Sequence, residues 1–272
     1  MLLLRRGAEG GRLGGPDRPV AGKRNDMLRT LLSIWIWFEM FFVSIILCTL
    51  LALLTPLLLP FDPQRRRLGR LYRLIAVLIA QLAPMWRVTF VGPMARRSPG
   101  RAVVICNHLS HLDSFFLASL PWEMKWLGKA SIFRVPFIGW GMHLAGDVPV
   151  VRGNRASAAA AMARCAAYLR QDMPVFIFPE GTRSTSDTML PFKDGAFRLA
   201  IETGAQVLPV AIAGTRQGLP KHAWRFNWTR AALTVGSPIS TNGLTLADVA
   251  GLRDQARAAI EALRDRLAAA QS

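Results

Sequence analysis

An apolar run near the beginning of the chain places the strongest constraint on the fold. Residues 31–59 read LLSIWIWFEMFFVSIILCTLLALLTPLLL, with a single charged residue. A helix over residues 31–53 would be roughly 34 Å long at about 1.5 Å per residue, enough to cross a hydrocarbon core of about 30 Å. The run therefore predicts a membrane helix. A secretory signal peptide is disfavoured, because the run and the segment before it are too long and no small-residue cleavage site is evident.

Two features argue against a helix that simply crosses the bilayer. Glu39 lies inside the run, where an unpaired carboxylate is costly. Basic residues flank both ends, whereas the positive-inside rule favours one side only; they are Lys23, Arg24 and Arg29 before the run and Arg65, Arg66, Arg67, Arg70 and Arg73 after it. A second apolar segment, residues 71–86, follows Pro60 and Pro63. We therefore expect a two-helix unit that lies in the cytoplasmic leaflet, with every basic flank at the same anionic surface.

The composition indicates what this chain binds. It has 34 Lys and Arg against 17 Asp and Glu, a formal net charge of +17. This excess predicts an anionic partner, such as lipid headgroups, nucleic acid or an acidic carrier. The three cysteines, at positions 48, 106 and 165, are far apart and form no CxxC pair. We expect no disulfide framework and a reducing compartment.

The remainder of the chain has an α/β pattern. Short apolar runs predict strands at 87–91, 102–106, 148–151, 174–178, 207–212 and 231–235. Helices are predicted over 154–171 and 246–269. The expected fold is an α/β domain with a mixed, largely parallel sheet flanked by helices, preceded by an N-terminal hydrophobic two-helix membrane unit.

Three segments are expected. Residues 1–26 are rich in Gly, Arg and Pro and predict a basic disordered tail. A translation start at Met27, which would leave this tail untranslated, is an open alternative. Residues 27–91 are expected to form the membrane-associated helical unit, and residues 92–272 the catalytic domain.

The heptad NHLSHLD at 107–113 contains two of the four histidines and follows a predicted strand. One interpretation is a helix N-terminus, in which Ser110 and Asp113 form a capping-box-like pair. A second pairs His108, placed in the turn before the helix, with Asp113; the carboxylate would fix the imidazole tautomer and leave the other nitrogen free to take a proton. A third is a metal site that includes His111, although no further ligands occur at a recognisable spacing.

A second motif, FPEGTRS at 178–184, follows a later predicted strand. Glu180 and Arg183 could pair with each other across a tight turn. Alternatively, Arg183 would offer a bidentate fork to a phosphate group, assisted by backbone amides of the turn. The motif by itself does not separate the two interpretations.

Together, NH-x4-D after one strand and FPEGTRS after a later strand resemble the glycerolipid acyltransferase superfamily, in particular its 1-acylglycerol-3-phosphate (lysophosphatidate) acyltransferase family. The resemblance extends over roughly residues 65–240. It includes GKASIFRVPFIGWGM at 128–142, FKDGAF at 192–197 and VLPVAI at 207–212. Hydrophobic helices upstream of these motifs are also typical of that family.

The resemblance implies a role for each matching residue. His108 is similar to the general base of the family, and Asp113 to the carboxylate that orients it. Lys129 and Arg183 resemble residues that hold the phosphate of the acceptor.

Three further positions, Glu180, Gly181 and Thr182, fall in the acceptor-binding motif. One block departs from the usual pattern, because the family often has an Asp-Arg pair where this chain has a valine before Arg152. Arg152 is retained as a phosphate-binding candidate, and His111 is interpreted as a turn residue outside the motif.

The activity implied by the resemblance is acyl transfer to the sn-2 hydroxyl of lysophosphatidic acid, giving phosphatidic acid for phospholipid synthesis. The donor is acyl-CoA or acyl carrier protein, used as a substrate, and no cofactor or metal is expected. The expected partners are a phospholipid membrane, the lysophospholipid acceptor and the donor, but no nucleic acid. The expected location is the cytoplasmic face of a membrane, the inner membrane if the source is bacterial.

Two other classes remain open at this point. The same motifs would serve an acyltransferase for another lysolipid, such as a lyso-ornithine lipid, or a phospholipid transacylase. A non-enzymatic basic protein that binds membranes would also suit the charge. Binding of nucleic acid is disfavoured, because no basic face interleaved with aromatic residues is evident.

Overall fold

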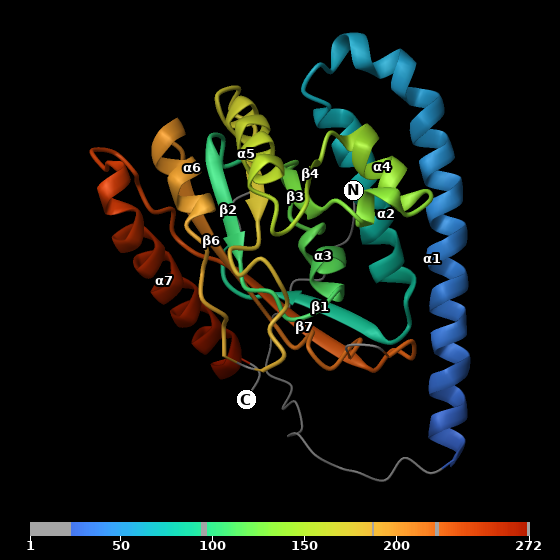
Figure 1. Cartoon of the computed structure of the whole chain (residues 1–272). Coiled ribbons are helices and arrows are strands. Elements are labelled where there is room, and N and C mark those ends of the chain that lie inside the picture. Colours follow the sequence, from blue (N-terminus) through green and yellow to red (C-terminus); the bar gives the residue numbers. More distant parts are fainter. Residues whose placement is uncertain (1–22, 94–96, 187, 221–222, 271–272) are drawn as a thin grey trace.

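A seven-stranded sheet forms the centre of the protein (Figure 1). The computed structural model describes residues 23–93, 97–186, 188–220 and 223–270. The strand order is β1-β7-β6-β2-β5-β3-β4, with β6 and β7 antiparallel and the other neighbours parallel. The strands are β1 Trp86–Phe90, β2 Ala102–Cys106, β3 Lys125–Lys129, β4 Val148–Val150, β5 Val175–Ile177, β6 Gln206–Ala213 and β7 Thr229–Val235. The predicted mixed, largely parallel sheet is confirmed.

Helices cover both faces of the sheet. They are α1 Lys23–Leu58, α2 Arg66–Leu82, α3 Leu112–Leu117, α4 Ile138–Ala145, α5 Arg155–Leu169, α6 Gly195–Thr203 and α7 Val249–Ala269. Short 3-10 turns lie at Leu59–Phe61, Ile132–Arg134 and Leu246–Asp248. Figure 1 shows α7 and α1 on opposite sides of the sheet.

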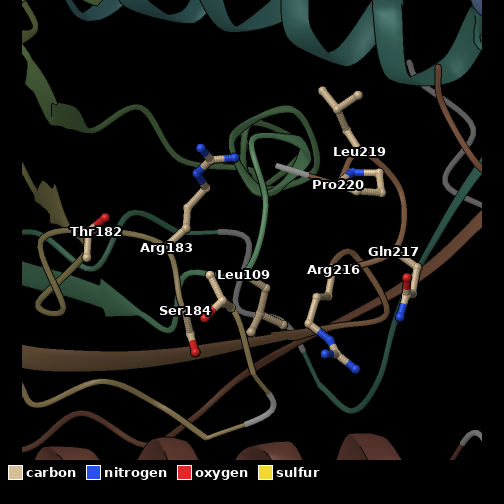
Figure 2. Close-up of a pocket in the computed structure, with 9 residues that line it drawn as sticks. Leu109, Thr182, Arg183, Ser184, Arg216, Gln217, Leu219 and Pro220 are labelled. Carbon is tan, nitrogen blue, oxygen red and sulfur yellow. The ribbon is translucent and has the colours of Figure 1, made fainter. Parts of the chain in front are cut away.

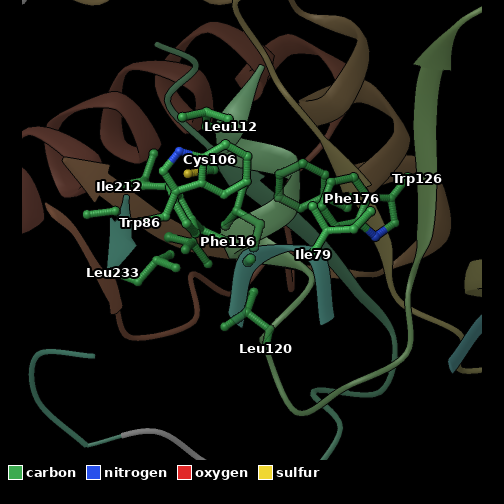
Figure 3. Packing of buried hydrophobic residues seen from close by; sticks show 14 of the residues in the cluster. Ile79, Trp86, Cys106, Leu112, Phe116, Leu120, Trp126, Phe176, Ile212 and Leu233 are labelled. Carbon is green, nitrogen blue, oxygen red and sulfur yellow. The ribbon is translucent and has the colours of Figure 1, made fainter. Parts of the chain in front are cut away.

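The central strand β2 is buried on both faces, as an apolar run between two helical layers requires. Val104 packs with residues of α2 and α3, including Ile79 and Phe116, in the cluster shown in Figure 3. Val103, on the opposite face, packs in a second cluster with residues of α5, α6 and α7. The end of β2 is thereby held firmly, and the catalytic candidates follow it directly.

The long helix α1 lies along the domain and packs on it through one stripe. Its buried residues recur every three to five positions, as expected for one face of a helix, and are Ser33, Ile36, Glu39, Ser44, Cys48 and Leu51. Arg29 Nε donates to the carbonyl of Phe226 (3.0 Å). The opposite face exposes large apolar side chains, among them Leu31, Ile34, Trp35, Phe38, Phe41, Phe42, Ile46, Leu50, Leu53 and Leu57. Among the described residues, α1 is the one helix that is long and apolar enough to cross a membrane.

The two N-terminal helices differ in detail from the expectation. Residues 1–22 of the predicted tail lie outside the described residues, and α1 begins at Lys23, inside the segment expected to be tail. Asp62, which precedes α2, caps its first turn, because its carboxylate accepts the backbone N–H groups of Arg66, Arg67 and Leu68. Such capping satisfies donors that a helix start leaves unpaired.

The arginine cluster after α1, which is expected at an anionic membrane surface, also fastens α2 to the domain. Four of these side chains donate to backbone carbonyls of residues in later segments: Arg65 to His143, Arg66 to Gln171 and Asp172, Arg70 to Leu120, and Arg73 to Met124. The physical reason is that carbonyl groups at the ends of helices and strands need donors, and these arginines supply them. The side chain of Arg67 is exposed.

Strand β3 was not predicted from the sequence. Its first residue, Lys125, is fully buried, and its ammonium donates to the Glu123 carboxylate (2.9 Å) and to the carbonyls of Arg65 and Ala145 (both 2.8 Å). Nearby, Arg73 pairs with the buried carboxylate of Asp147. Charged residues are rarely buried unless paired, so a sequence pattern alone points away from a strand here.

Candidate functional site

The candidate site lies where neighbouring strands end. β2 lies between β5 and β6 and is parallel to both, so their carboxyl ends meet at one edge of the sheet. The heptad 107–113 follows β2, the motif 178–184 follows β5, and residues 214–216 follow β6. Open α/β sheets typically place ligands outside the carboxyl ends of their strands.

The structure brings His108 and Asp113 together. Imidazole Nδ1 lies 2.8 Å from Asp113 Oδ2, and the carboxylate is fully buried. The same oxygen accepts the backbone N–H groups of Leu109 (2.7 Å) and Ser110 (2.9 Å). An oxygen that already accepts two N–H groups acts as an acceptor for the imidazole too, so Nδ1 carries the proton and Nε2 is unprotonated in the neutral ring.

The capping and catalytic interpretations of the heptad therefore describe one arrangement. The Asp113 carboxylate accepts the Ser110 N–H, which is half of a capping box, and it also holds His108. The hydroxyl of Ser110 accepts from Leu112 N instead of completing the box (3.3 Å). His111 is the residue before α3 and is exposed.

The imidazole of His108 is fixed on one face and at one nitrogen. The ring of Phe178 stacks on it with centroids 3.8 Å apart and an angle of 14° between the planes. Within the described residues no hydrogen bond to Nε2 is found, and the side chain keeps a small exposed fraction of 11%. Nε2 is thus the atom through which His108 can exchange a proton with a bound molecule.

Two residues that the sequence reasoning did not single out support this pair. Thr215 Oγ donates to the second oxygen of Asp113 (2.5 Å). Asn107 donates to the carbonyl of Ile212 (2.9 Å) and accepts its N–H (3.0 Å), which ties the ends of β2 and β6 together. Both partners lie more than 100 positions away in the chain, so no local pattern could reveal them.

The two motifs are joined by hydrogen bonds. Glu180 Oε1 accepts the backbone N–H of His108 and Oε2 that of Leu190, both at 2.8 Å. The N–H of Ser184 donates to the carbonyl of His108 (2.8 Å). Glu180 is only 3% exposed, and burial raises the pKa of its carboxyl group. These contacts show Glu180 fixing the position of the two turns; its predicted contact with an acceptor stays a prediction.

The turn at Gly181 depends on glycine. Its φ is +67°, which L residues adopt rarely, and a Cβ there would lie 2.9 Å from Cε and Nζ of Lys193. Lys193 therefore packs over the turn of the FPEGTRS motif. Lys193 is thus a cation beside this motif, in addition to Arg183. It belongs to the block FKDGAF, to which the sequence reasoning assigned no role.

Cationic side chains lie at the same edge of the sheet as His108 and Asp113. The pKa of Arg152 is lowered by partial burial and, to a smaller extent, by the charge of Arg183. The pKa of His111 is lowered mainly by the same two causes, in the same order. The guanidinium of Arg183 is therefore close enough to act on both. Lys129 is exposed at the carboxyl end of β3, beside the parallel strand β4 that leads to Arg152. The predicted phosphate-binding residues thus share one edge of the sheet.

A cavity of about 220 Å³ opens next to the turn that carries His108. Figure 2 shows Thr182, Arg183 and Ser184 on one side and Leu219 and Pro220 on the other. Among the residues that the structure describes, the lining comprises Leu109, Thr182, Arg183, Ser184, Thr185, Arg216, Gln217, Leu219 and Pro220. A cavity with a cationic wall and an apolar wall suits a molecule with a phosphate and a hydrocarbon part.

The metal interpretation of the heptad gains no support. In the part of the chain that the structure describes, no group of three or more His, Cys, Asp or Glu side chains could hold a metal ion. The expectation that the reaction needs neither metal nor cofactor stays a prediction.

Known acyltransferases are similar to this chain. Residues 87–213 match the family model described as Acyltransferase. A 1-acyl-sn-glycerol-3-phosphate acyltransferase of Chlamydomonas reinhardtii is 34% identical over 206 residues, 75% of this chain and 62% of the relative. A chloroplastic enzyme of the same name from Arabidopsis thaliana is 38% identical over 168 residues, 61% of this chain and 46% of the relative. This chain therefore spans less than two thirds of the length of both relatives.

A solved structure has the same fold over almost its whole length. The crystal structure of the 1-acyl-sn-glycerophosphate (LPA) acyltransferase PlsC from Thermotoga maritima superposes with a TM-score of 0.77 at 21% identity. The match covers 90% of this chain and 98% of that chain. The similarity includes most of this chain, well beyond the 127 residues from 87 to 213 that the family model matches.

Proposed function

Because residues 87–213 match the family model described as Acyltransferase, we propose that this protein transfers a fatty acyl group from a thioester donor to the sn-2 hydroxyl of lysophosphatidic acid. The family match confirms the resemblance seen in the two motifs. The observation that carries the proposal is the His108–Asp113 pair, with Nε2 open, beside a cavity lined by Arg183. The curated relatives are named 1-acyl-sn-glycerol-3-phosphate acyltransferases, which agrees with the proposed acceptor.

In the proposed reaction His108 acts as a general base and then as a general acid. Nε2 takes the proton of the sn-2 hydroxyl while the oxygen attacks the thioester carbonyl carbon. A C–O bond forms, and the carbonyl oxygen becomes an oxyanion in a tetrahedral intermediate. The C–S bond then breaks, and the departing sulfur takes the proton from the imidazolium. The products are phosphatidic acid and a free thiol, with no acyl-enzyme.

Asp113 supports both protonation states of the base. Its carboxylate holds the Nδ1 proton, so Nε2 faces the acceptor in the correct tautomer. When His108 becomes an imidazolium, the buried negative charge stabilises it. Thr215 and two backbone N–H groups hold the carboxylate in place, so the pair is arranged before substrate binds.

The phosphate of the acceptor is the expected ligand of the cations at this edge. Arg183 lines the cavity and can offer two parallel N–H groups to a phosphate. Lys193 lies over the adjacent turn, and Arg152 lies within range of the Arg183 charge. The acyl chain of the acceptor would extend along Leu219 and Pro220. Acyl-CoA and acyl carrier protein are both anionic and suit the net charge of +17.

We further propose that α1 lies in one leaflet and does not cross the membrane. Its buried stripe from Ser33 to Leu51 packs on the domain over roughly 27 Å at about 1.5 Å per residue. That length approaches the hydrocarbon thickness of about 30 Å, so an upright helix would draw the domain into the bilayer with it. A helix lying flat buries only its outward apolar face in lipid. We place α1 in the cytoplasmic leaflet, because acyl thioesters are made on the cytoplasmic side of the membrane.

Thiol release from a panel of substrates tests the proposed function. The purified full chain is supplied with palmitoyl-CoA or palmitoyl-acyl carrier protein, and with lysophosphatidate, lysophosphatidylcholine or a lyso-ornithine lipid. We expect thiol release that requires lysophosphatidate and that falls by about 10²- to 10⁴-fold in His108→Ala. Turnover of another lysolipid in preference to lysophosphatidate would overturn the assigned acceptor. Turnover that is unaffected in His108→Ala would overturn the mechanism.

A further inference from the structure

The loop between β6 and β7, residues 214–228, presents two tryptophans to the outside. Trp224 is 51% exposed and Trp228 is 63% exposed, whereas Phe226 between them is 1% exposed. Phe226 packs against Trp86 of β1, with ring centroids 5.1 Å apart. The inward phenylalanine therefore anchors a segment whose tryptophans point away from the domain. Exposed pairs of tryptophan are unusual on a surface in contact with water alone, because each indole carries a large apolar area.

The loop is also fastened to α1. Ser33 Oγ accepts the N–H of Phe226 (2.9 Å), Arg29 donates to its carbonyl (3.0 Å), and Trp37 Nε1 donates to the carbonyl of Trp224 (2.8 Å). The Trp37 and Phe226 rings lie 5.3 Å apart. These contacts join the loop to the side of α1 that faces the domain, where Ser33 is buried, whereas Leu31, Trp35 and Phe38 are exposed on the opposite side of the helix.

We propose that the β6–β7 loop is a second membrane-contacting element, which places Trp224 and Trp228 in the headgroup region of the leaflet that receives α1. The proposal rests on the membrane attachment given under the proposed function. Tryptophan favours this region because its ring is apolar and its N–H finds a polar partner there. Arg230, which follows the loop and is exposed, adds a cation suited to lipid phosphates.

The contact has a consequence for substrate access. The first part of the same loop contributes Gln217, Leu219 and Pro220 to the lining of the cavity beside His108. A loop seated on the bilayer by its distal tryptophans therefore holds this wall of the cavity toward the lipid. The lysolipid acceptor would enter from the leaflet past the apolar wall, with its phosphate moving toward Arg183.

Nitroxide labels at single introduced cysteines test the contact. The native cysteines at positions 48, 106 and 165 are buried, so a maleimide label is directed to an exposed position, with unmodified protein as the labelling control. The variants are Trp228→Cys on the loop, Phe38→Cys on α1 and Ala258→Cys on α7, which lies across the sheet from α1 (Figure 1). Accessibility to oxygen and to a water-soluble nickel complex is measured on phosphatidylglycerol–phosphatidylethanolamine vesicles.

We expect the labels at 228 and 38 to favour oxygen and the label at 258 to favour the nickel complex. If 228 behaves like 258 while 38 is in lipid, the loop proposal fails and the membrane attachment of α1 stands. If 38 is also in water, the attachment itself fails. The three results separate the two proposals, because each label reports its own position.

Kinetic measurements on a second variant show whether the exposed tryptophans contact lipid or a protein partner. The double variant Trp224→Ser, Trp228→Ser should bind vesicles about tenfold more weakly, since two partly buried indoles are lost. Its apparent KM for lysophosphatidate in vesicles should rise, while turnover of a water-soluble short-chain lysophosphatidate should not change. A loss confined to acyl carrier protein as donor, with acyl-CoA unaffected, would assign the tryptophans to the carrier and overturn the proposal.

Discussion

Replacing Asp113 with asparagine removes the charge of the carboxylate while retaining its hydrogen bonds. The oxygen that faces His108 also accepts the backbone N–H groups of Leu109 and Ser110. These two donors require the amide oxygen of the new asparagine at that position, because an NH2 group there would meet them donor to donor. The NH2 group then faces Thr215, whose hydroxyl can accept as well as donate. The fold and the imidazole tautomer should both be preserved.

The expected loss can be estimated from the electrostatics. An imidazolium and a carboxylate with charge centres about 4 Å apart attract by about 4 kcal/mol at an effective dielectric constant of about 20. One factor of ten in rate corresponds to about 1.36 kcal/mol, so Asp113→Asn should lower kcat by about 10³-fold. In serine hydrolases the corresponding change costs about 10⁴-fold, because there the tautomer is also wrong. The smaller value here follows from the two backbone N–H groups.

Initial rates of thiol release with saturating lysophosphatidate and acyl-CoA would measure this loss. The matched control is His111→Ala, which changes an exposed histidine in the same heptad and should stay within about threefold of wild type, as surface substitutions usually do. Circular dichroism and the melting temperature of Asp113→Asn should match those of the wild type. A loss below tenfold, or an equal loss in His111→Ala, would refute the reasoning.

Three further changes test separate parts of the site and of its support. Arg183→Lys retains the charge but loses the bidentate fork, so the KM for lysophosphatidate should rise about tenfold or more; a change confined to the KM of the thioester would contradict the assignment. Thr215→Val removes a hydrogen bond to a buried carboxylate, worth about 1.5–3 kcal/mol, so kcat should fall by about ten- to a hundredfold with little change in KM, and an unchanged kcat would show that Thr215 does not position Asp113. Arg73→Leu leaves the buried Asp147 without its ion pair, so urea denaturation should show a loss of about 3–5 kcal/mol; a loss below about 1 kcal/mol would mean that the pair contributes little to stability.

Strands with plain apolar sequences were predicted closely, and the strand that contains a buried charge was not. The five residues of β2 are all buried and all apolar, and the predicted range 102–106 is the observed one. β3 begins with Lys125, whose burial depends on Glu123 and on two carbonyls from distant segments. Burial of an ammonium group is a property of its surroundings, so sequence periodicity does not reveal it.

The candidate site shows the same division between local and distant contacts. The pairing of His108 with Asp113, five positions apart, was one interpretation of the heptad, and the resemblance to the acyltransferase family favoured it. The support from Thr215 comes from a residue 102 positions away, at the end of another strand. Glu180 was placed in the acceptor-binding motif, where its contact with an acceptor stays a prediction, and its carboxylate accepts the backbone N–H groups of His108 and Leu190. That orientation depends on how β5 aligns with β2, which the sequence does not specify.

The link through Glu180 bears on how the proposed enzyme combines recognition with catalysis. In the proposed reaction, the base comes from the turn after β2 and the main phosphate ligand from the turn after β5, and neither is useful unless the acceptor hydroxyl reaches Nε2 when its phosphate is bound. Effective alignment of this kind contributes much of the rate in reactions between two bound groups. Glu180 joins the two turns through the His108 N–H, and Ser184 joins them again through the His108 carbonyl. The backbone of the two turns is therefore held at a fixed separation, and in the proposed reaction the contacts that hold the base in place would also favour an acceptor whose phosphate and hydroxyl are spaced as in lysophosphatidate.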